Sequence, residues 1–183
     1  MDNAEHLLEK AWRARRARHL EAAHAALDKA IVMSRSAGNE AILAKALLQQ
    51  AQVERDRGRP NSAVPLYEEA VRLFRVLGDP LALASAVRHL GDTHSERGDF
   101  DEAMPCYDEA LAIYRAVDDP PGLALANALR PMALLHEAQG ANDIALPLWR
   151  EAFSLYNAAG VDAGVEECGV HLTALASPHS PSQ

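Results

Sequence analysis

The stretch LALASAVRHLGDTHSERGDFDEAMPCYDEALAIYRAVDDP, residues 81–120, recurs along the chain. A shift of 40 residues aligns it with AILAKALLQQAQVERDRGRPNSAVPLYEEAVRLFRVLGDP, residues 41–80. A shift of 42 residues aligns its first part with LALANALRPMALLHEAQG, residues 123–140. A fixed period between about 20 and 50 residues is typical of a repeat array, in which each unit packs against its neighbours. The period therefore predicts one continuous stack of similar units.

Each repeat has the pattern of two helices joined by a turn. Apolar residues recur at helical spacing from Leu83 to Leu90 and again from Ala103 to Tyr114. Gly98 interrupts the pattern, and we expect Asp101, like Asn61 in the preceding repeat, to cap the second helix. We expect a single array over residues 1–176, with repeats at about 1–40, 41–80, 81–122 and 123–160, a capping helix at about 162–176 and a disordered tail at 177–183.

Composition and charge narrow the class of protein. Of 183 residues, 49% are hydrophobic and 24% are charged, as in folded proteins. The first residues have no apolar signal region and no run is long enough to span a membrane, so we expect a cytoplasmic protein. In that compartment Cys106 and Cys168 are expected to be reduced, with a disulfide between them as the less favoured alternative.

The net charge of −8 is unevenly distributed. Residues 1–80 carry 13 Lys/Arg and 11 Asp/Glu, whereas residues 81–183 carry 5 and 15. This balance argues against nucleic-acid binding, which requires a basic footprint. The basic run RARRAR, residues 13–18, has two interpretations, an anion site or a solvated helix face, and the second is favoured for so short a run.

The repeat positions are similar to those of the tetratricopeptide repeat (TPR) family, whose pattern is W-x2-L-G-x2-Y, then A-x3-F, a small residue and a closing proline. Residues 81–120 match it at Leu90, Gly91, Ala103, Tyr107 and Pro120. The resemblance covers about residues 1–160. It implies an all-α fold, a right-handed superhelical solenoid of four TPR-like helical hairpins plus a C-terminal capping helix.

Small and large residues alternate as close helix packing requires. The first helices carry Ala11, Ala51, Gly91 and Ala133 where helices cross, and the second helices carry Ala23, Ala63, Ala103 and Ala145. The aromatic residues Tyr67, Tyr107 and Trp149 are expected to fill the space between repeats.

The chain also departs from the family pattern. The period of 40–42 residues exceeds the family's usual 34 or so. The first-helix tyrosine is replaced by Ala14, Glu54, His94 and His136. This long variant resembles arrays in bacterial transcriptional regulators, peptide-sensing regulators and cell-polarity adaptors.

No catalytic motif is present: the chain has no P-loop, no GxSxG and no HExxH. His94 and His136 share a repeat position, which suggests either a metal-ligand pair or ordinary packing. Packing is favoured because no zinc spacing is present. We therefore expect no enzyme, no cofactor and no metal.

The resemblance implies a concave groove lined by the first helices. The groove candidates are Trp12, Arg15, Arg16, Lys45, Leu48, Gln52, Arg55, Arg88, Asp92, Asn127, Arg130 and Leu134. Six of them are basic, and arginine forks suit carboxylates, so we expect a protein or peptide ligand with acidic residues. The alternative is that the arginines pair internally with Asp56, Asp92, Glu96 and Glu137.

Four functional classes are considered. A non-catalytic adaptor that binds a peptide or protein segment is favoured. The alternatives are a homo-oligomeric scaffold, such as a homodimer formed through the ends of the stack, and a regulatory sensor domain of a larger transcription or signalling system. An enzyme dependent on a small molecule or metal is disfavoured.

Overall fold

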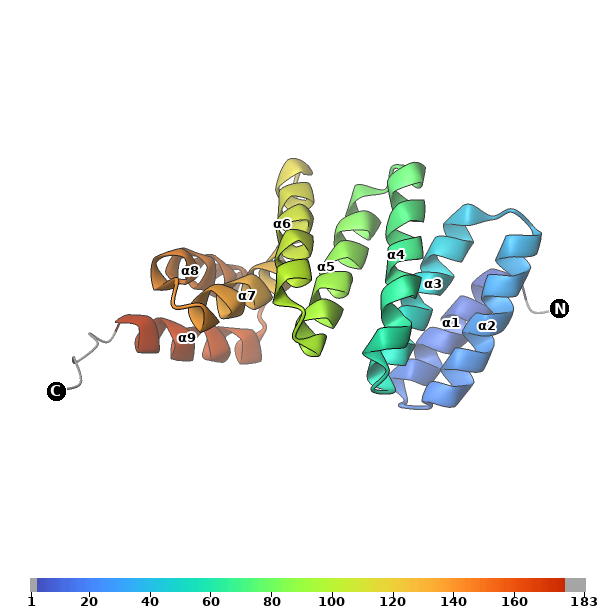
Figure 1. The fold of residues 1–183 in the computed structure, drawn as a ribbon, viewed down its shortest axis with the longest axis horizontal. Coiled ribbons are helices and arrows are strands. Elements are labelled where there is room, and N and C mark those ends of the chain that lie inside the picture. Colours follow the sequence, from blue (N-terminus) through green and yellow to red (C-terminus); the bar gives the residue numbers. More distant parts are fainter. Residues whose placement is uncertain (1–2, 177–183) are drawn as a thin grey trace. The chain divides into compact units, whose positions relative to one another are not determined.

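The computed structural model describes residues 3–176, and the predicted tail at 177–183 lies outside them. The described residues form helices and no strand, so the all-α prediction is confirmed (Figure 1). The helices are α1 (Ala4–Arg16), α2 (Leu20–Ser36), α3 (Glu40–Asp56), α4 (Pro60–Leu77), α5 (Pro80–Arg97), α6 (Phe100–Ala116), α7 (Gly122–Ala138), α8 (Asn142–Ala158) and α9 (Asp162–Ala176). None of them is long and apolar enough to cross a membrane.

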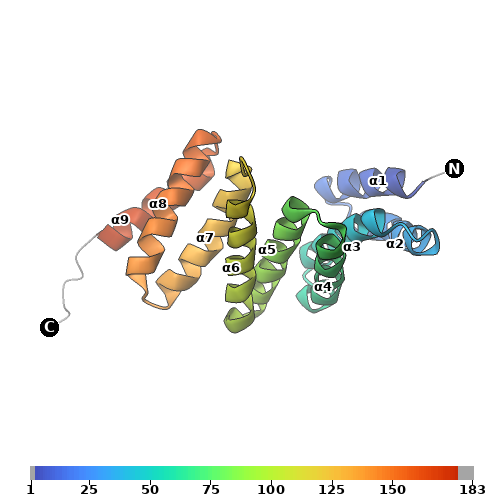
Figure 2. The ribbon, with the colours of Figure 1, turned by 90° about the horizontal axis from the view of Figure 1, so that it is seen from above.

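The chain divides into two compact units, Met1–Cys106 and Tyr107–Gln183, and the boundary falls within α6. In the first unit α1 packs on α2 and α3 on α4, while α2 contacts α3 and α4 contacts α5. The first helices α1, α3 and α5 also contact one another in sequence order. In the second unit α7 packs on α8 and α8 on α9, which lie side by side in Figure 2.

The turns lie at the glycines, as predicted, but two of the predicted helix N-caps are wrong. Gly58 and Gly98 adopt left-handed backbone conformations with φ of 72° and 81°, which an L side chain adopts only with strain. After them α4 begins at Pro60 and α6 at Phe100, so the predicted caps Asn61 and Asp101 lie inside the first turns. Proline suits the first helical position because its fixed φ is helical and its missing N–H would have no partner there.

Alanines let the helices approach closely. The predicted crossing positions Ala51, Ala63, Ala103, Ala133 and Ala145 are all fully buried. Tyr67, Tyr107 and Trp149 are fully buried as well. The predicted alternation of small and large residues therefore builds the core of each unit.

The predicted capping helix α9 covers α8 through a glycine. Gly164 lies against the ring of Tyr156, and a Cβ at this position would be only 2.5 Å from the Tyr156 Cγ. Tyr156 in turn donates a hydrogen bond from its hydroxyl to Asn127 Oδ1 at 2.8 Å. Helices α7, α8 and α9 are therefore held together by one aromatic residue.

Candidate functional site

The first helices of the first unit bring most of the predicted groove residues together. We call this surface the first-helix face; it comprises Trp12, Arg15 and Arg16 of α1, Lys45, Leu48, Gln52, Arg55 and Asp56 of α3, and Arg88, His89, Asp92 and Glu96 of α5. Contacts between neighbouring first helices join most of these residues, whereas Lys45 and Leu48 are assigned to the face by their positions in the repeat.

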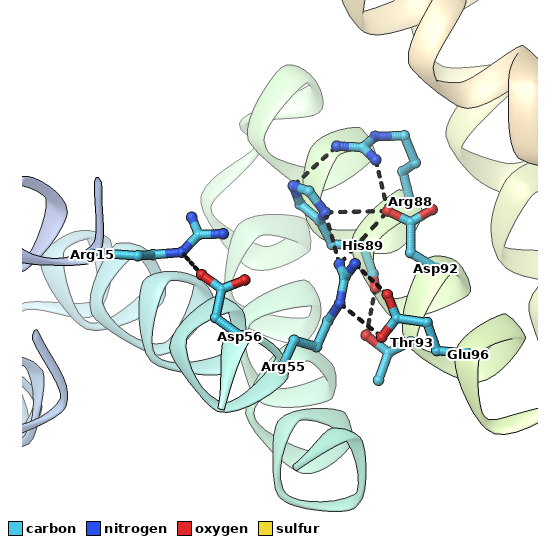
Figure 3. A network of polar contacts seen from close by, with 8 residues as sticks. All are labelled: Arg15, Arg55, Asp56, Arg88, His89, Asp92, Thr93 and Glu96. Carbon is cyan, nitrogen blue, oxygen red and sulfur yellow. Dashed lines mark hydrogen bonds and ion pairs between the residues drawn. The ribbon is translucent and has the colours of Figure 1, made fainter. Parts of the chain in front are cut away.

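Two arginines cross between first helices in the same way. Arg15 Nε donates to Asp56 Oδ2 at 2.7 Å, and its Nη1 donates to Gln52 Oε1 at 2.6 Å. One repeat later, Arg55 Nη2 donates to Glu96 Oε1 at 2.6 Å, and its Nη1 lies 3.7 Å from Asp92 Oδ2. Each arginine therefore bridges one turn of the next first helix, and we call these contacts the inter-repeat arginine pairs (Figure 3).

Arg88 is held within its own helix. Its Nη1 donates to Asp92 Oδ2 at 2.7 Å and its Nη2 donates to His89 Nε2 at 2.9 Å. His89 Nδ1 lies 3.3 Å from the same Asp92 oxygen, and Figure 3 shows Asp92 between Arg88, His89 and Arg55. Because Nε2 accepts from Arg88, the proton of the neutral imidazole sits on Nδ1, which faces the carboxylate.

Electrostatics keep this cluster in fixed protonation states. Burial lowers the pKa of His89, and the positive charges of Arg88 and Arg55 act in the same direction, against the hydrogen bond with Asp92. Burial works to raise the pKa of Asp92, but the hydrogen bond with His89 and the charge of Arg88 lower it overall. Burial also raises the pKa of Tyr67, which stacks on His89, to about 12. At neutral pH the cluster is a carboxylate held by two guanidinium groups and a neutral ring.

Three cations on or beside the first-helix face differ from Arg15, Arg55 and Arg88 in their ion pairing. Arg16, Arg18 and Lys45 are exposed, and none has a carboxylate of the described residues within ion-pair distance. Arg16 instead lies over the indole of Trp12, with 4.9 Å from its Cζ to the ring centroid. Trp12 is 48% exposed, an unusual state for so large an apolar side chain. The basic residues predicted to line the groove therefore fall into two groups. Arg15 and Arg55 pair with carboxylates of the next first helix, whereas Arg16 and Lys45 have no such partner among the described residues.

The remaining predicted residues lie on α7 in the second unit. Arg130 Nε donates to Glu167 Oε2 of α9 at 2.7 Å, and Asn127 accepts from Tyr156 as described above. Leu134 is half-buried. Glu137, expected as an arginine partner, instead accepts hydrogen bonds from Trp149 Nε1 at 3.0 Å and His171 Nδ1 at 2.8 Å, so that expectation is wrong. His171 stacks on Trp149 at 4.2 Å between centroids, which places Glu137 at the edge of both rings.

A buried polar cluster between α2 and α3 was not expected from the sequence. The Glu54 side chain is 6% exposed and accepts from Arg57 Nη1 at 2.7 Å, with His24 Nδ1 at 2.9 Å. Gln50 Nε2 donates to Asp28 Oδ1 at 2.9 Å nearby. The one signal in the sequence was the glutamate at a position that the repeat pattern gives to tyrosine. The buried Glu54 carboxylate is therefore compensated by Arg57 and His24 within the fold.

A second surface lies on the outer side of the first hairpin. There Leu7, Asp28, Lys29, Val32 and Met33 line a mainly apolar cavity of about 360 Å³. Val32 is 64% exposed. Within residues 3–176, no three His, Cys, Asp or Glu side chains are arranged to hold a metal ion.

Comparisons with known proteins agree with this fold. Residues 42–116 match the family model described as tetratricopeptide repeat. BtubC (BKLC) from P. vanneervenii has a similar structure, with a TM-score of 0.72 at 16% identity, over 98% of this chain and 83% of its own. A kinesin light chain from Podosopora anserina with nearly identical TPR-like repeats gives a TM-score of 0.71 at 15% identity, over 100% of both chains. A single-residue variant of it gives 0.72 at 15% identity, over 96% of both.

No curated protein matches the sequence. The structural neighbours share the fold along nearly all of this chain, and the family match covers the second repeat and most of the third. The predicted resemblance is confirmed over residues 42–116, which match the tetratricopeptide repeat family.

Proposed function

We propose that this protein is a non-catalytic cytoplasmic interaction module that binds a peptide or protein segment with acidic residues on its first-helix face. The observation that supports this proposal most directly is the pair of exposed cations beside Trp12, Arg16 and Arg18, which have no carboxylate partner among the described residues; Lys45 on α3 is likewise exposed and unpaired among them. In a protein of net charge −8, these side chains offer a local positive field to an acidic ligand.

The engaged arginines support the proposal in another way. Arg15 and Arg55 fix the spacing of α1, α3 and α5 through partly buried hydrogen bonds. A face whose helices are already positioned loses little conformational freedom when a ligand binds, which favours affinity. Arg15 and Arg55 therefore serve the scaffold, while Arg16 and Lys45 are the side chains that contact the ligand.

The exposed indole supplies an apolar anchor. Tryptophan and arginine dominate the energetics of protein interfaces, and Trp12 and Arg16 are already stacked. Leu48 is half-buried against the cluster of Ala51, Ala63 and Tyr67, so it extends the apolar surface on α3. An acidic segment with an apolar residue is the ligand that matches this combination. The same mode of binding would serve an adaptor or a sensor domain of a larger regulator.

The test is a synthetic peptide array in which every Asp or Glu peptide has a partner spot with Asn or Gln. We expect the native protein to prefer the acidic spots. Reversing Arg16 and Lys45 to glutamate should weaken that preference about tenfold, equivalent to about 1.4 kcal/mol. The matched control is Arg72→Glu, because Arg72 is also exposed and has no ion-pair partner among residues 3–176, but lies on the second helix α4. Equal loss with Arg72→Glu, or no loss with the double reversal, would refute this assignment.

A second candidate function is self-association. The apolar cavity at Leu7, Val32 and Met33 favours it, because exposed apolar patches mark interaction surfaces. We expect light scattering to report a dimer that Val32→Glu dissociates if this surface joins two copies. A monomer across the working concentration range would remove this candidate and leave the peptide-binding function in place.

A further inference from the structure

The turn between α1 and α2 departs from every other hairpin turn of the chain's repeats. Arg18 has φ of 61°, in the left-handed region, at the position that Gly58, Gly98 and Gly140 occupy in the later repeats. Glycine adopts this conformation without a steric cost, whereas arginine is strained there. Retained strain of this kind points to a functional use of the side chain.

Arg18 contributes to a cavity beside the first-helix face. Trp12, Arg15, Arg16, Arg18 and Asp56 line a volume of about 330 Å³. Arg15 is the partner of Asp56 and Gln52, so the single carboxylate of the cavity is already neutralised. Arg16 and Arg18 remain without carboxylates within ion-pair distance among the described residues. The cavity therefore has an excess of positive charge beside an exposed indole.

We propose that this cavity is an anion subsite that accepts the carboxylate of an Asp or Glu side chain of the bound peptide. The inference rests on the proposed function and specifies where its acidic residue binds. Arginine presents a planar fork of donors that matches the two oxygens of a carboxylate, and two such forks flank the cavity. The carbon atoms next to the carboxylate pack on Trp12, whose ring is 48% exposed.

The position of Arg18 explains why glycine does not occupy it. A glycine would relieve the strained backbone but would remove one of the two available guanidinium groups. We therefore expect Arg18→Gly both to stabilise the fold and to weaken anion binding. Asp119→Gly is a matched control, because Asp119 also has a positive φ, 54°, and does not line the cavity.

Tryptophan fluorescence tests the subsite directly. Trp12 is exposed and Trp149 is fully buried, so collisional quenchers in solution report on Trp12. Iodide, an anion, should quench Trp12 at least about twofold more strongly than caesium at low ionic strength, despite the net charge of −8. Arg18→Gly should raise the melting temperature and lower iodide quenching, while Asp119→Gly should raise the melting temperature alone. Trp12→Phe should abolish the quenchable signal.

Adding synthetic peptides to the quenching experiment tests whether the subsite accepts a peptide carboxylate. A synthetic peptide containing Glu-Glu-Asp should protect Trp12 from iodide, and its Gln-Gln-Asn counterpart should not. Inorganic phosphate at the same concentration should protect less than the acidic peptide, and stronger protection by phosphate would overturn the assignment to a peptide carboxylate. Equal quenching by iodide and caesium, or iodide quenching unchanged by Arg18→Gly, would overturn the subsite.

Two further outcomes distinguish the two claims. An acidic peptide that binds the native protein and Arg18→Gly with equal affinity would overturn the subsite and leave the proposed function standing. Strong iodide quenching that depends on Arg18, without binding of any acidic peptide, would overturn the proposed function and leave the anion site.

Discussion

Replacing Arg88 with methionine tests the division between scaffold arginines and ligand-binding arginines. Methionine keeps much of the aliphatic stem and removes the guanidinium group that donates to Asp92 at 2.7 Å and to His89 at 2.9 Å. Asp92 would keep its longer contacts with His89 at 3.3 Å and with Arg55 at 3.7 Å. The carboxylate is largely buried, with 19% of its side chain exposed, so its lost partner cannot be fully replaced by water.

The expected magnitude follows from these contacts. A hydrogen bond to a charged group contributes about 1.5–3 kcal/mol. Because two weaker partners and some solvent remain, we expect Arg88→Met to lower the free energy of unfolding by about 1–2 kcal/mol. At about 2–4 °C per kcal/mol for a protein of this size, the melting temperature should fall by about 2–8 °C.

The assay is thermal and urea unfolding followed by far-UV circular dichroism, with Arg72→Met as the control. Arg72 is exposed and forms no ion pair within the described part of the chain, so its substitution should change stability by no more than about 0.5 kcal/mol. Arg88→Met combined with Asp92→Asn should cost about 1 kcal/mol less than the sum of the two single changes, because the pair is removed together. Equal effects at Arg88 and Arg72, or additive effects of the pair, would refute the reasoning.

Three other substitutions probe separate features. The free energy of unfolding should fall as the pH decreases below 6.5, because His89 in the unfolded chain then takes up a proton that the folded residue, with its lowered pKa, does not. Urea midpoints measured across this pH range should depend less on pH in His89→Gln than in the native protein. Gly164→Ala should destabilise the protein by about 1–3 kcal/mol in urea, since its Cβ would meet Tyr156, whereas a Cβ at Gly169 would meet open space, so the alanine variant there should not destabilise. Trp149→Phe should lower the melting temperature by removing the hydrogen bond to Glu137, with unchanged stability as the contradicting result.

The backbone was predictable because its signals are local. Glycines at the turns and alanines at the helix crossings act through the small size of their side chains, which can be read directly from the sequence. The helices therefore lie close to where the repeat period placed them. The misplaced caps Asn61 and Asp101 show the limit of such reasoning, since Pro60 starts its helix one residue before the expected cap.

The charge pattern was predictable only in part. The sequence identified the arginines of the first helices, but which carboxylate each one reaches depends on distances between helices. The pairing of Arg15 with Asp56 and of Arg55 with Glu96 agrees with the internal-pairing alternative. Glu137 belongs to the Trp149 and His171 stack because α9 brings His171 there. Such tertiary contacts cannot be read from the spacing of residues in one repeat.

The most direct test of the central claim is an NMR titration of the ¹⁵N-labelled protein with an acidic peptide selected from the array. The account predicts shifts that cluster on α1 and α3, including the indole N–H of Trp12 and the backbone amides near Arg16 and Lys45. Shifts confined to α2 and α4, or to the apolar surface at Leu7, Val32 and Met33, would contradict binding on the first-helix face.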